Sequence, residues 1–196
     1  MAFKSSKGFS ISLTEAMHIL VSVATISLAF TLFPVGSFDF DKFTAILITV
    51  GAGFVLHELG HKYLAINYGA KAEYRAWTWG LFLALGMAFL TNGGFIFAAP
   101  GAVYIFGKTV SKEENGRIAL AGPLVNLALA IVFLAIGVLL PNLSAIAGIG
   151  VYVNAFLGAF NLIPFPPLDG SKVFAWNKGV WAAIFLANAS ILFLLF

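Results

Sequence analysis

Hydrophobic and charged positions alternate along the chain in long blocks, with apolar stretches separated by short charged segments. The stretches that carry at most one ionisable group cover 16–38, 43–56, 76–107, 118–168 and 179–196. A helix needs about 20 apolar residues to cross a bilayer, so 118–168 has room for two helices, with a turn expected at Pro141-Asn142. The pattern predicts membrane-spanning helices over 14–34, 43–68, 118–140, 144–163 and 179–196.

Composition supports a bilayer as the solvent of this protein. Hydrophobic residues make up 61% of the 196 positions and charged residues only 10%, whereas soluble domains are about half apolar and a quarter charged. Soluble enzymes and disordered proteins are therefore excluded. The net charge of +3 comes without a basic stripe, which argues against a nucleic-acid partner. The chain has no Cys, which excludes disulfides and thiolate metal sites.

The stretch 77–107 does not fit a simple spanning helix. Trp79 to Leu90 has helical character but is short for a span, and Asn92-Gly93-Gly94 follows it. Aromatic and β-branched residues on both sides of Pro100-Gly101 then predict two short extended segments, 95–97 and 103–106. Non-helical backbone at membrane depth must be buried in protein or line a cavity. This stretch therefore either spans once or dips into the membrane and returns to the same side.

The distribution of basic residues favours the dip. With Lys4 and Lys7 on one side, a returning hairpin places every Lys and Arg except Lys42 on that side, whereas a single crossing divides them almost evenly. Basic residues concentrate in cytoplasmic loops. We predict an all-α integral membrane protein, a single domain over 1–196, with about five to six transmembrane helices and a re-entrant hairpin at about 77–107. The N-terminus is cytoplasmic, and the first apolar stretch is a spanning helix or signal anchor rather than a cleaved signal peptide.

The chemistry of this chain is concentrated in His57-Glu58-Leu59-Gly60-His61, inside the second predicted span. Residues four apart lie on one helical face, so His57 and His61 can bind one zinc ion. Glu58 is rotated away from that face and suits a general base acting on a water molecule. Ionisable groups at membrane depth are costly and generally functional. The alternative is a polar patch that packs helices.

Zinc requires a third protein ligand, and Asp169 is the best candidate. It follows Pro164, Pro166 and Pro167, which end the fourth long helix and leave an unwound segment that can line a cavity. His61 lies about 10 Å from the cytoplasmic end of its helix, counted at 1.5 Å per residue, and Asp169 follows a helix that ends on the same side. The other candidates are less suitable. His18 lies near a membrane interface, and Asp39 and Asp41 lie in a short loop. Glu113 and Glu114 lie in a charged, solvated loop.

The two segments together resemble the site-2 protease family of intramembrane zinc metalloproteases. The resemblance rests on His57-Glu58-Leu59-Gly60-His61 and on Asn161-x-x-Pro164-x-x-x-Leu168-Asp169-Gly170, supported by Ala121-Gly122-Pro123 before an apolar helix. It implies one zinc ion per chain, bound by His57, His61 and Asp169, with Glu58 as general base. It also implies that Asn161 holds the substrate or stabilises the oxyanion. The chain is similar to compact archaeal members, and we expect neither a PDZ nor a CBS domain.

We expect the protein to hydrolyse peptide bonds in or near membrane-spanning segments of single-span or otherwise hydrophobic membrane proteins, as in regulated intramembrane proteolysis. The hairpin from Gly93 to Phe106 offers either a strand edge for an extended substrate segment or a plug that shields zinc from lipid. Two other functions remain open: a zinc-binding membrane protein without catalysis, such as a pseudoprotease or transporter, and another class of membrane zinc peptidase. The expected location is a cell membrane, with the active site nearer the cytoplasmic side. The oligomeric state is left open.

Overall fold

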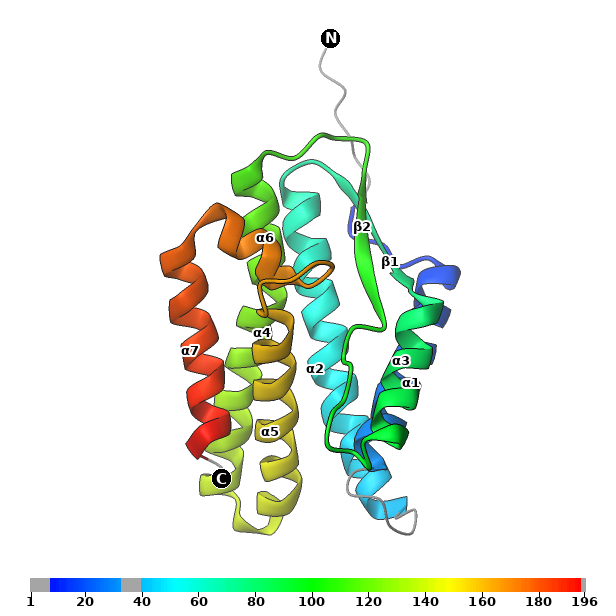
Figure 1. Cartoon of the computed structure of the whole chain (residues 1–196), viewed down its shortest axis with the longest axis vertical. Helices are drawn as coiled ribbons and strands as arrows, with labels where there is room; N and C mark the ends of the chain where they lie inside the picture. Colours follow the sequence, from blue (N-terminus) through cyan, green and yellow to red (C-terminus); the bar gives the residue numbers. More distant parts are fainter. Residues whose placement is uncertain (1–7, 33–39, 195–196) are drawn as a thin grey trace.

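The structure is a computed structural model that describes residues 8–32 and 40–194. Lys4, Lys7 and Asp39, which entered the predictions above, lie outside the described residues. Helices dominate the described part, with one pair of strands among them (Figure 1). The elements in chain order are α1 (Leu13–Thr31), α2 (Phe40–Asn67), β1 (Lys71–Ala76), α3 (Thr78–Leu90), β2 (Gly101–Phe106), α4 (Lys112–Leu139), the 3-10 turn η1 (Pro141–Leu143), α5 (Ser144–Asn161), α6 (Asp169–Trp176) and α7 (Lys178–Leu194).

Every predicted span corresponds to a helix, within a few residues at each end except at the start of α4. Four helical segments are long and apolar enough to cross a membrane: α1, α2, α4 and the η1–α5 segment. The apolar helices α3 and α7 are shorter than those four, with 13 and 17 residues. The structure thus supports a multi-pass, mostly helical membrane protein, while the count of five to six spans stays a prediction.

The break between α4 and α5 was predicted correctly, but the start of α4 was not. Glu113 and Glu114 were expected in a solvated loop, yet they lie in the first turn of α4, which begins at Lys112. Ser111 caps this turn by accepting from the backbone N–H of Glu114, and the Glu114 carboxylate accepts from the N–H of Ser111 at 2.8 Å. This capping box satisfies free amides at the helix start, and it extends α4 beyond its apolar part.

The strand within the stretch 77–107 pairs with a segment that precedes the stretch. β2 pairs antiparallel with β1, in the register Ala76↔Gly101 to Lys71↔Phe106. Of the two extended segments expected in this stretch, 103–106 is part of β2, whereas residues 95–97 form no strand. The missing partner, β1, has buried Ala72 and Tyr74 in alternation but carries three charged residues. Because Ala76 pairs with Gly101, the intervening residues 77–100 form an excursion that leaves the strand pair and returns to it.

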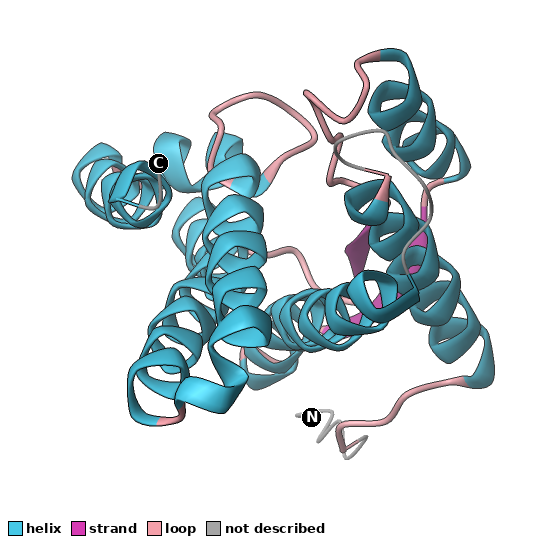
Figure 2. Ribbon diagram, turned by 90° about the horizontal axis from the view of Figure 1, so that it is seen from below, coloured by secondary structure: helices cyan, strands magenta, loops and turns pink. Residues whose placement is uncertain are grey.

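Helix α2 lies at the centre of the molecule. It contacts α1 and the strands on one side and α4 and α5 on the other (Figure 1). Seen along the helices, the strands lie among them on the side of α1 and α3 (Figure 2). The largest core cluster joins side chains of α1, α2, α3 and α5 to Tyr74 of β1. α2 carries His57, Glu58 and His61. These three side chains therefore lie between α1 and the strands on one side and α4 and α5 on the other.

Candidate metal centre

Two histidines on one face of α2 form the base of the candidate site. His57 and His61 are buried, with exposed fractions of 3% and 6%. Their ring centroids lie 4.6 Å apart and the rings are nearly perpendicular. The four-residue spacing therefore places both imidazoles side by side, as the sequence pattern predicted.

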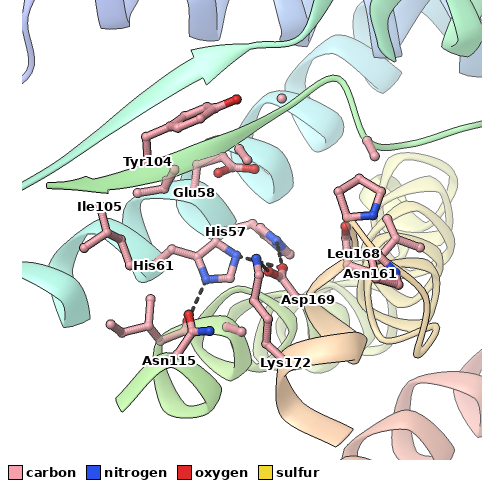
Figure 3. Close-up of a pocket in the computed structure, with 18 of the residues that line it drawn as sticks. His57, Glu58, His61, Tyr104, Ile105, Asn115, Asn161, Leu168, Asp169 and Lys172 are labelled. Atoms are coloured by element: carbon pink, nitrogen blue, oxygen red, sulfur yellow. Dashed lines mark hydrogen bonds and ion pairs between the residues drawn. The ribbon is translucent and has the colours of Figure 1, made fainter. Parts of the chain in front are cut away.

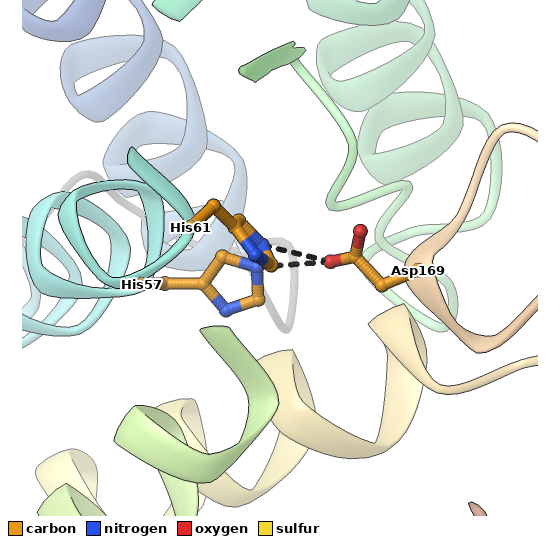
Figure 4. Close-up of side chains that lie close together, drawn as sticks. All are labelled: His57, His61 and Asp169. Carbon is orange, nitrogen blue, oxygen red and sulfur yellow. Dashed lines mark hydrogen bonds and ion pairs between the residues drawn. The ribbon is translucent and has the colours of Figure 1, made fainter. Parts of the chain in front are cut away.

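Asp169 joins these histidines from the first residue of α6. Its Oδ2 lies 3.3 Å from Nε2 of His57 and 3.0 Å from Nε2 of His61 (Figure 4). Each of the three residues offers one potential ligand atom, and these three atoms all lie within 4.8 Å of one another. Gly170 permits this approach, because a Cβ there would lie 2.0 Å from the carbonyl oxygen of Leu162. The proline-rich segment thus folds back over the end of α5.

Hydrogen bonds on the far side of each ring determine which nitrogen faces Asp169. Nδ1 of His57 lies 2.5 Å from Oδ1 of Asn126, and Nδ1 of His61 lies 2.7 Å from the carbonyl oxygen of Ile118. Both oxygens can only accept hydrogen bonds, so each Nδ1 carries the proton. In the neutral imidazole this leaves the lone pair on Nε2 of both rings, which is the form that binds a metal ion.

Asn126 belongs to a buried polar network that the sequence reasoning missed. Its Nδ2 donates to the carbonyl oxygen of Gly53 at 3.2 Å and to Oδ1 of Asn154 at 3.1 Å, and Nδ2 of Asn154 donates to the carbonyl oxygen of Gly150. Both asparagines are completely buried. Their contact joins α4 and α5, and Asn126 also orients a candidate ligand. The sequence does show a side-chain amide in an apolar helix, but it does not show which residue that amide contacts.

Gly122 of α4 leaves open space beside both Nε2 atoms. A Cβ at this position would lie 2.5 Å from Nε2 of His57 and 2.5 Å from Nε2 of His61. Two imidazole nitrogens and a carboxylate oxygen are the donor set of a catalytic zinc site. The open space and the donor atoms therefore fit a zinc ion.

The cluster opens into a cavity of about 470 Å³ that β2 and the segment 166–169 also line (Figure 3). Glu58 faces this cavity and is buried, and its Oε2 has no hydrogen-bond partner among the described residues. Asn161, at the end of α5, lines the cavity and donates from Nδ2 to the carbonyl oxygen of Leu157 at 3.0 Å. Lys172, which the sequence reasoning did not select, also lines the cavity, with Nζ 3.3 Å from Oδ1 of Asp169.

The other described candidates lie outside this cluster. His18 accepts a hydrogen bond from the backbone N–H of Ala76, and Asp41 lies in the first turn of α2. Glu113 pairs with Arg117 at 2.6 Å, and Glu114 pairs with Lys108 at 2.8 Å. Glu114 also caps α4 by accepting from the N–H of Ser111. The structure thus separates these groups from the three that converge.

Comparison with known proteins agrees with the chemistry of this cluster. The sequence model of peptidase family M50 matches residues 45–142, which include both histidines and Glu58. A protein of Methanocaldococcus jannaschii, MJ0611, described by name as a candidate zinc metalloprotease, is 42% identical over 90% of this chain and 91% of its own length. This chain belongs to peptidase family M50. The family expected from the two sequence motifs is thereby confirmed.

More distant relatives of this M50 chain are longer. The protein of Methanocaldococcus jannaschii named zinc metalloprotease MJ0392 is 30% identical over 84% of this chain and 44% of its own length. Rip2 of Mycobacterium tuberculosis, also described by name as a candidate zinc metalloprotease, is 33% identical over 65% of this chain and 56% of its own length. No solved structure matches.

Proposed function

We propose that this M50 zinc metalloprotease hydrolyses peptide bonds within or near the membrane-spanning segments of other membrane proteins. The observation that carries the proposal is the convergence of His57, His61 and Asp169 beside a cavity, in a structure with four candidate membrane spans. In the proposed site these three residues hold one zinc ion and Glu58 is the general base. A buried carboxylate with an unpaired oxygen is costly, and a catalytic role explains its presence here.

The protein's own residues account for most of the proposed chemistry. When bound, zinc lowers the pKa of a water molecule to about 7 and polarises the scissile carbonyl. Glu58 accepts the proton of the attacking water and delivers it to the leaving amine. Asn126 and the Ile118 carbonyl keep the two imidazoles in the required tautomer. Lys172, by contacting Oδ1 of Asp169, leaves Oδ2 directed at the histidines.

The cavity also suits an extended substrate segment. A peptide bond in a helix is protected by its own hydrogen bond, so the substrate must unwind before hydrolysis. The edge of β2 borders the cavity and can pair with an unwound segment, as in other strand-addition complexes. Nδ2 of Asn161 has two hydrogens, one of which is directed to Leu157. The other is available for a substrate carbonyl or the developing oxyanion.

The proposed orientation places the N-terminus in the cytoplasm and the metal centre nearer that side of the membrane. The pairing of Ala76 with Gly101 supports a dip and return of the chain between them. The described basic residues that flank this excursion, Lys71, Arg75 and Lys108, then lie on one side together. This topology satisfies the preference for basic residues in cytoplasmic loops.

Cleavage and zinc content measured on the same preparations test this function. Wild type, Glu58→Gln and Asp169→Ala would be purified in detergent and given a single-span test substrate. We expect Glu58→Gln to retain zinc and lose at least about 10²-fold in kcat, because only the base is removed. We expect Asp169→Ala to lose both zinc and activity.

Glu113→Gln is the matched control, because Glu113 is an exposed glutamate at the start of α4. It should leave zinc and cleavage unchanged. Zinc retained in Asp169→Ala would contradict the ligand assignment. Wild-type activity that survives Glu58→Gln would contradict the assignment of the base. A zinc-loaded wild type that cleaves none of a panel of single-span substrates would contradict proteolysis itself.

A further inference from the structure

A polar stripe runs along one face of α1. Its members follow each other at intervals of three or four residues, which places them on one helical face. They are Ser12, Glu15, His18 and Ser22. Ser12 caps the helix and Glu15 and Ser22 are completely or almost completely buried. A face of this kind in a membrane helix requires polar partners.

Every member of the stripe finds its partner on β1. Glu15 accepts from the backbone N–H of Tyr74 at 3.0 Å, and Nδ1 of His18 accepts from the N–H of Ala76 at 3.2 Å. The hydroxyl groups of Ser22 and Tyr74 lie 2.8 Å apart, and the Ser12 hydroxyl donates to Glu73. Through Glu15 and His18, the helix therefore supplies acceptors to two of the β1 amides that a third strand would engage.

The alternating hydrogen bonds between β1 and β2 show which edge of this strand pair is occupied and which edge is open. The N–H of Trp77 donates to the carbonyl oxygen of Pro100 at 2.7 Å, which makes this a hydrogen-bonded pair. In antiparallel pairs such positions alternate, so Tyr74 and Ala76 direct their N–H groups away from β2, towards α1. On β2, the alternation directs the N–H groups of Gly101, Val103 and Ile105 to the opposite edge.

This opposite edge faces the cavity. Gly101, Val103 and Ile105 all line it, and the alternation of the ladder leaves their N–H groups unused by β1. An isolated pair of strands is only marginally stable and has two edges on which an extended segment can add. With α1 occupying one edge, the edge beside the metal centre is the one left for substrate.

The stripe is also fixed to the helix that carries the metal ligands. Nζ of Lys62 lies 2.5 Å from Oε2 of Glu15 and donates to the carbonyl oxygen of Ser10 at 2.6 Å, and both charged side chains are almost fully buried. Lys62 directly follows His61. Tyr74 extends the connection to β2, because a Cβ on Gly101 would lie 2.2 Å from the Tyr74 hydroxyl oxygen. α1, α2, β1 and β2 are thus joined through neighbouring polar contacts.

We propose that this stripe is a positioning element for the substrate: Glu15 and His18 occupy the outer edge of β1, Ser22 holds the Tyr74 side chain, and together they keep the open edge of β2 beside the metal centre. The proposal rests on the proposed function, since it assigns a role in substrate binding to residues far from the reacting atoms. None of the stripe residues lines the cavity. They act through β1 and β2, and they should affect the affinity for substrate rather than zinc binding or the chemical step.

Two substitutions test the stripe without leaving a buried charge unpaired. His18→Leu removes the acceptor for Ala76, and Ser22→Ala removes the partner of the Tyr74 hydroxyl. For a single-span test substrate, we expect each to raise KM about fivefold with kcat and zinc content unchanged, which is the signature of lost uniform binding. His18→Asn, whose Oδ1 can replace Nδ1 as acceptor, should restore KM to within about twofold of wild type.

Ser27→Ala is the matched control, because Ser27 is a fully buried serine on α1 whose hydroxyl has no partner among the described residues. It should leave KM unchanged. An unchanged KM in His18→Leu, or a loss confined to kcat or to zinc content, would overturn the proposal.

A wild type that cuts no substrate would count against the proposed function only. Amide hydrogen exchange in the same variants then tests the stripe by itself. We expect faster exchange at Tyr74 and Ala76 and along 101–106 in His18→Leu, and wild-type exchange in His18→Asn. Equal exchange in wild type and His18→Leu would overturn the proposed role of α1.

Discussion

Glu58 lies between two regions that are held together by different interactions. On one side, α4, α5 and α6 enclose the candidate metal ligands, and the contacts are short, buried and specific to single atoms, as between His57 and Asn126. On the other side, the backbone amides of β1 donate hydrogen bonds to side chains of α1, and β2 is held by its pairing with β1. We call these the metal side and the sheet side of α2.

The difference indicates a division of labour. A catalytic metal site needs ligands held to within a fraction of an ångström, and completely buried polar residues provide such constraint on the metal side. A protease that accepts different unwound segments gains more from a backbone edge, because amides bind an extended chain irrespective of its side chains. Substitutions on the metal side should therefore alter zinc binding, and those on the sheet side should alter the affinity for substrate.

Gly122→Ala should give the largest effect and would act entirely on the metal side. The added methyl group would lie 2.5 Å from Nε2 of both histidines, so the imidazoles or α4 would have to move. We expect zinc content to fall below about 10% of wild type and cleavage to fall at least about 10²-fold, because misplacing catalytic groups by 1 Å is this costly. Metal analysis and cleavage on one preparation would measure both.

Gly148→Ala in α5 is the control, since a Cβ there meets no atom within 4 Å. It should retain zinc and activity. Normal zinc content in Gly122→Ala would show that the space beside the histidines is not where the metal ion binds.

Asn126→Leu should give the next largest effect. It removes the oxygen that fixes the tautomer of His57, and loss of such an outer partner commonly lowers metal affinity 10- to 100-fold. Asn154→Leu, one contact further from the metal ligands, should have a smaller effect. Competition with a chelator would give the zinc affinity, and activity at saturating zinc should largely recover. Equal zinc affinity in wild type and Asn126→Leu would separate the buried network from the metal centre.

The metal side was largely predictable from the sequence, and the sheet side was not. His57 and His61 are brought together by helical periodicity, which is local, and Asp169 was reached because prolines mark the end of a helix. β1 was missed since its partner lies far along the chain and its charged residues conceal the alternation of Ala72 and Tyr74. His18 was likewise considered an isolated interfacial residue, because only tertiary pairing reveals the amide of Ala76.

Val103→Pro should give the smallest of these effects and would act entirely on the sheet side. Its N–H points to the open edge of β2, so proline removes no ladder hydrogen bond and is compatible with an edge strand. The substrate would lose one backbone partner, and one hydrogen bond is worth about 0.5–1.5 kcal/mol. We therefore expect KM for a single-span substrate to rise about 3- to 10-fold, while kcat and zinc content stay at the wild-type level.

Val103→Ala separates the loss of the amide from the loss of the side chain, because Val103 also packs against core clusters. The alanine variant should bind substrate more tightly than the proline variant. Equal KM values for wild type and Val103→Pro would favour the hairpin as a plug that shields the metal centre. A fall in zinc content would show that the two sides of α2 are coupled, because a change confined to a backbone amide of β2 would then alter metal binding at His57 and His61.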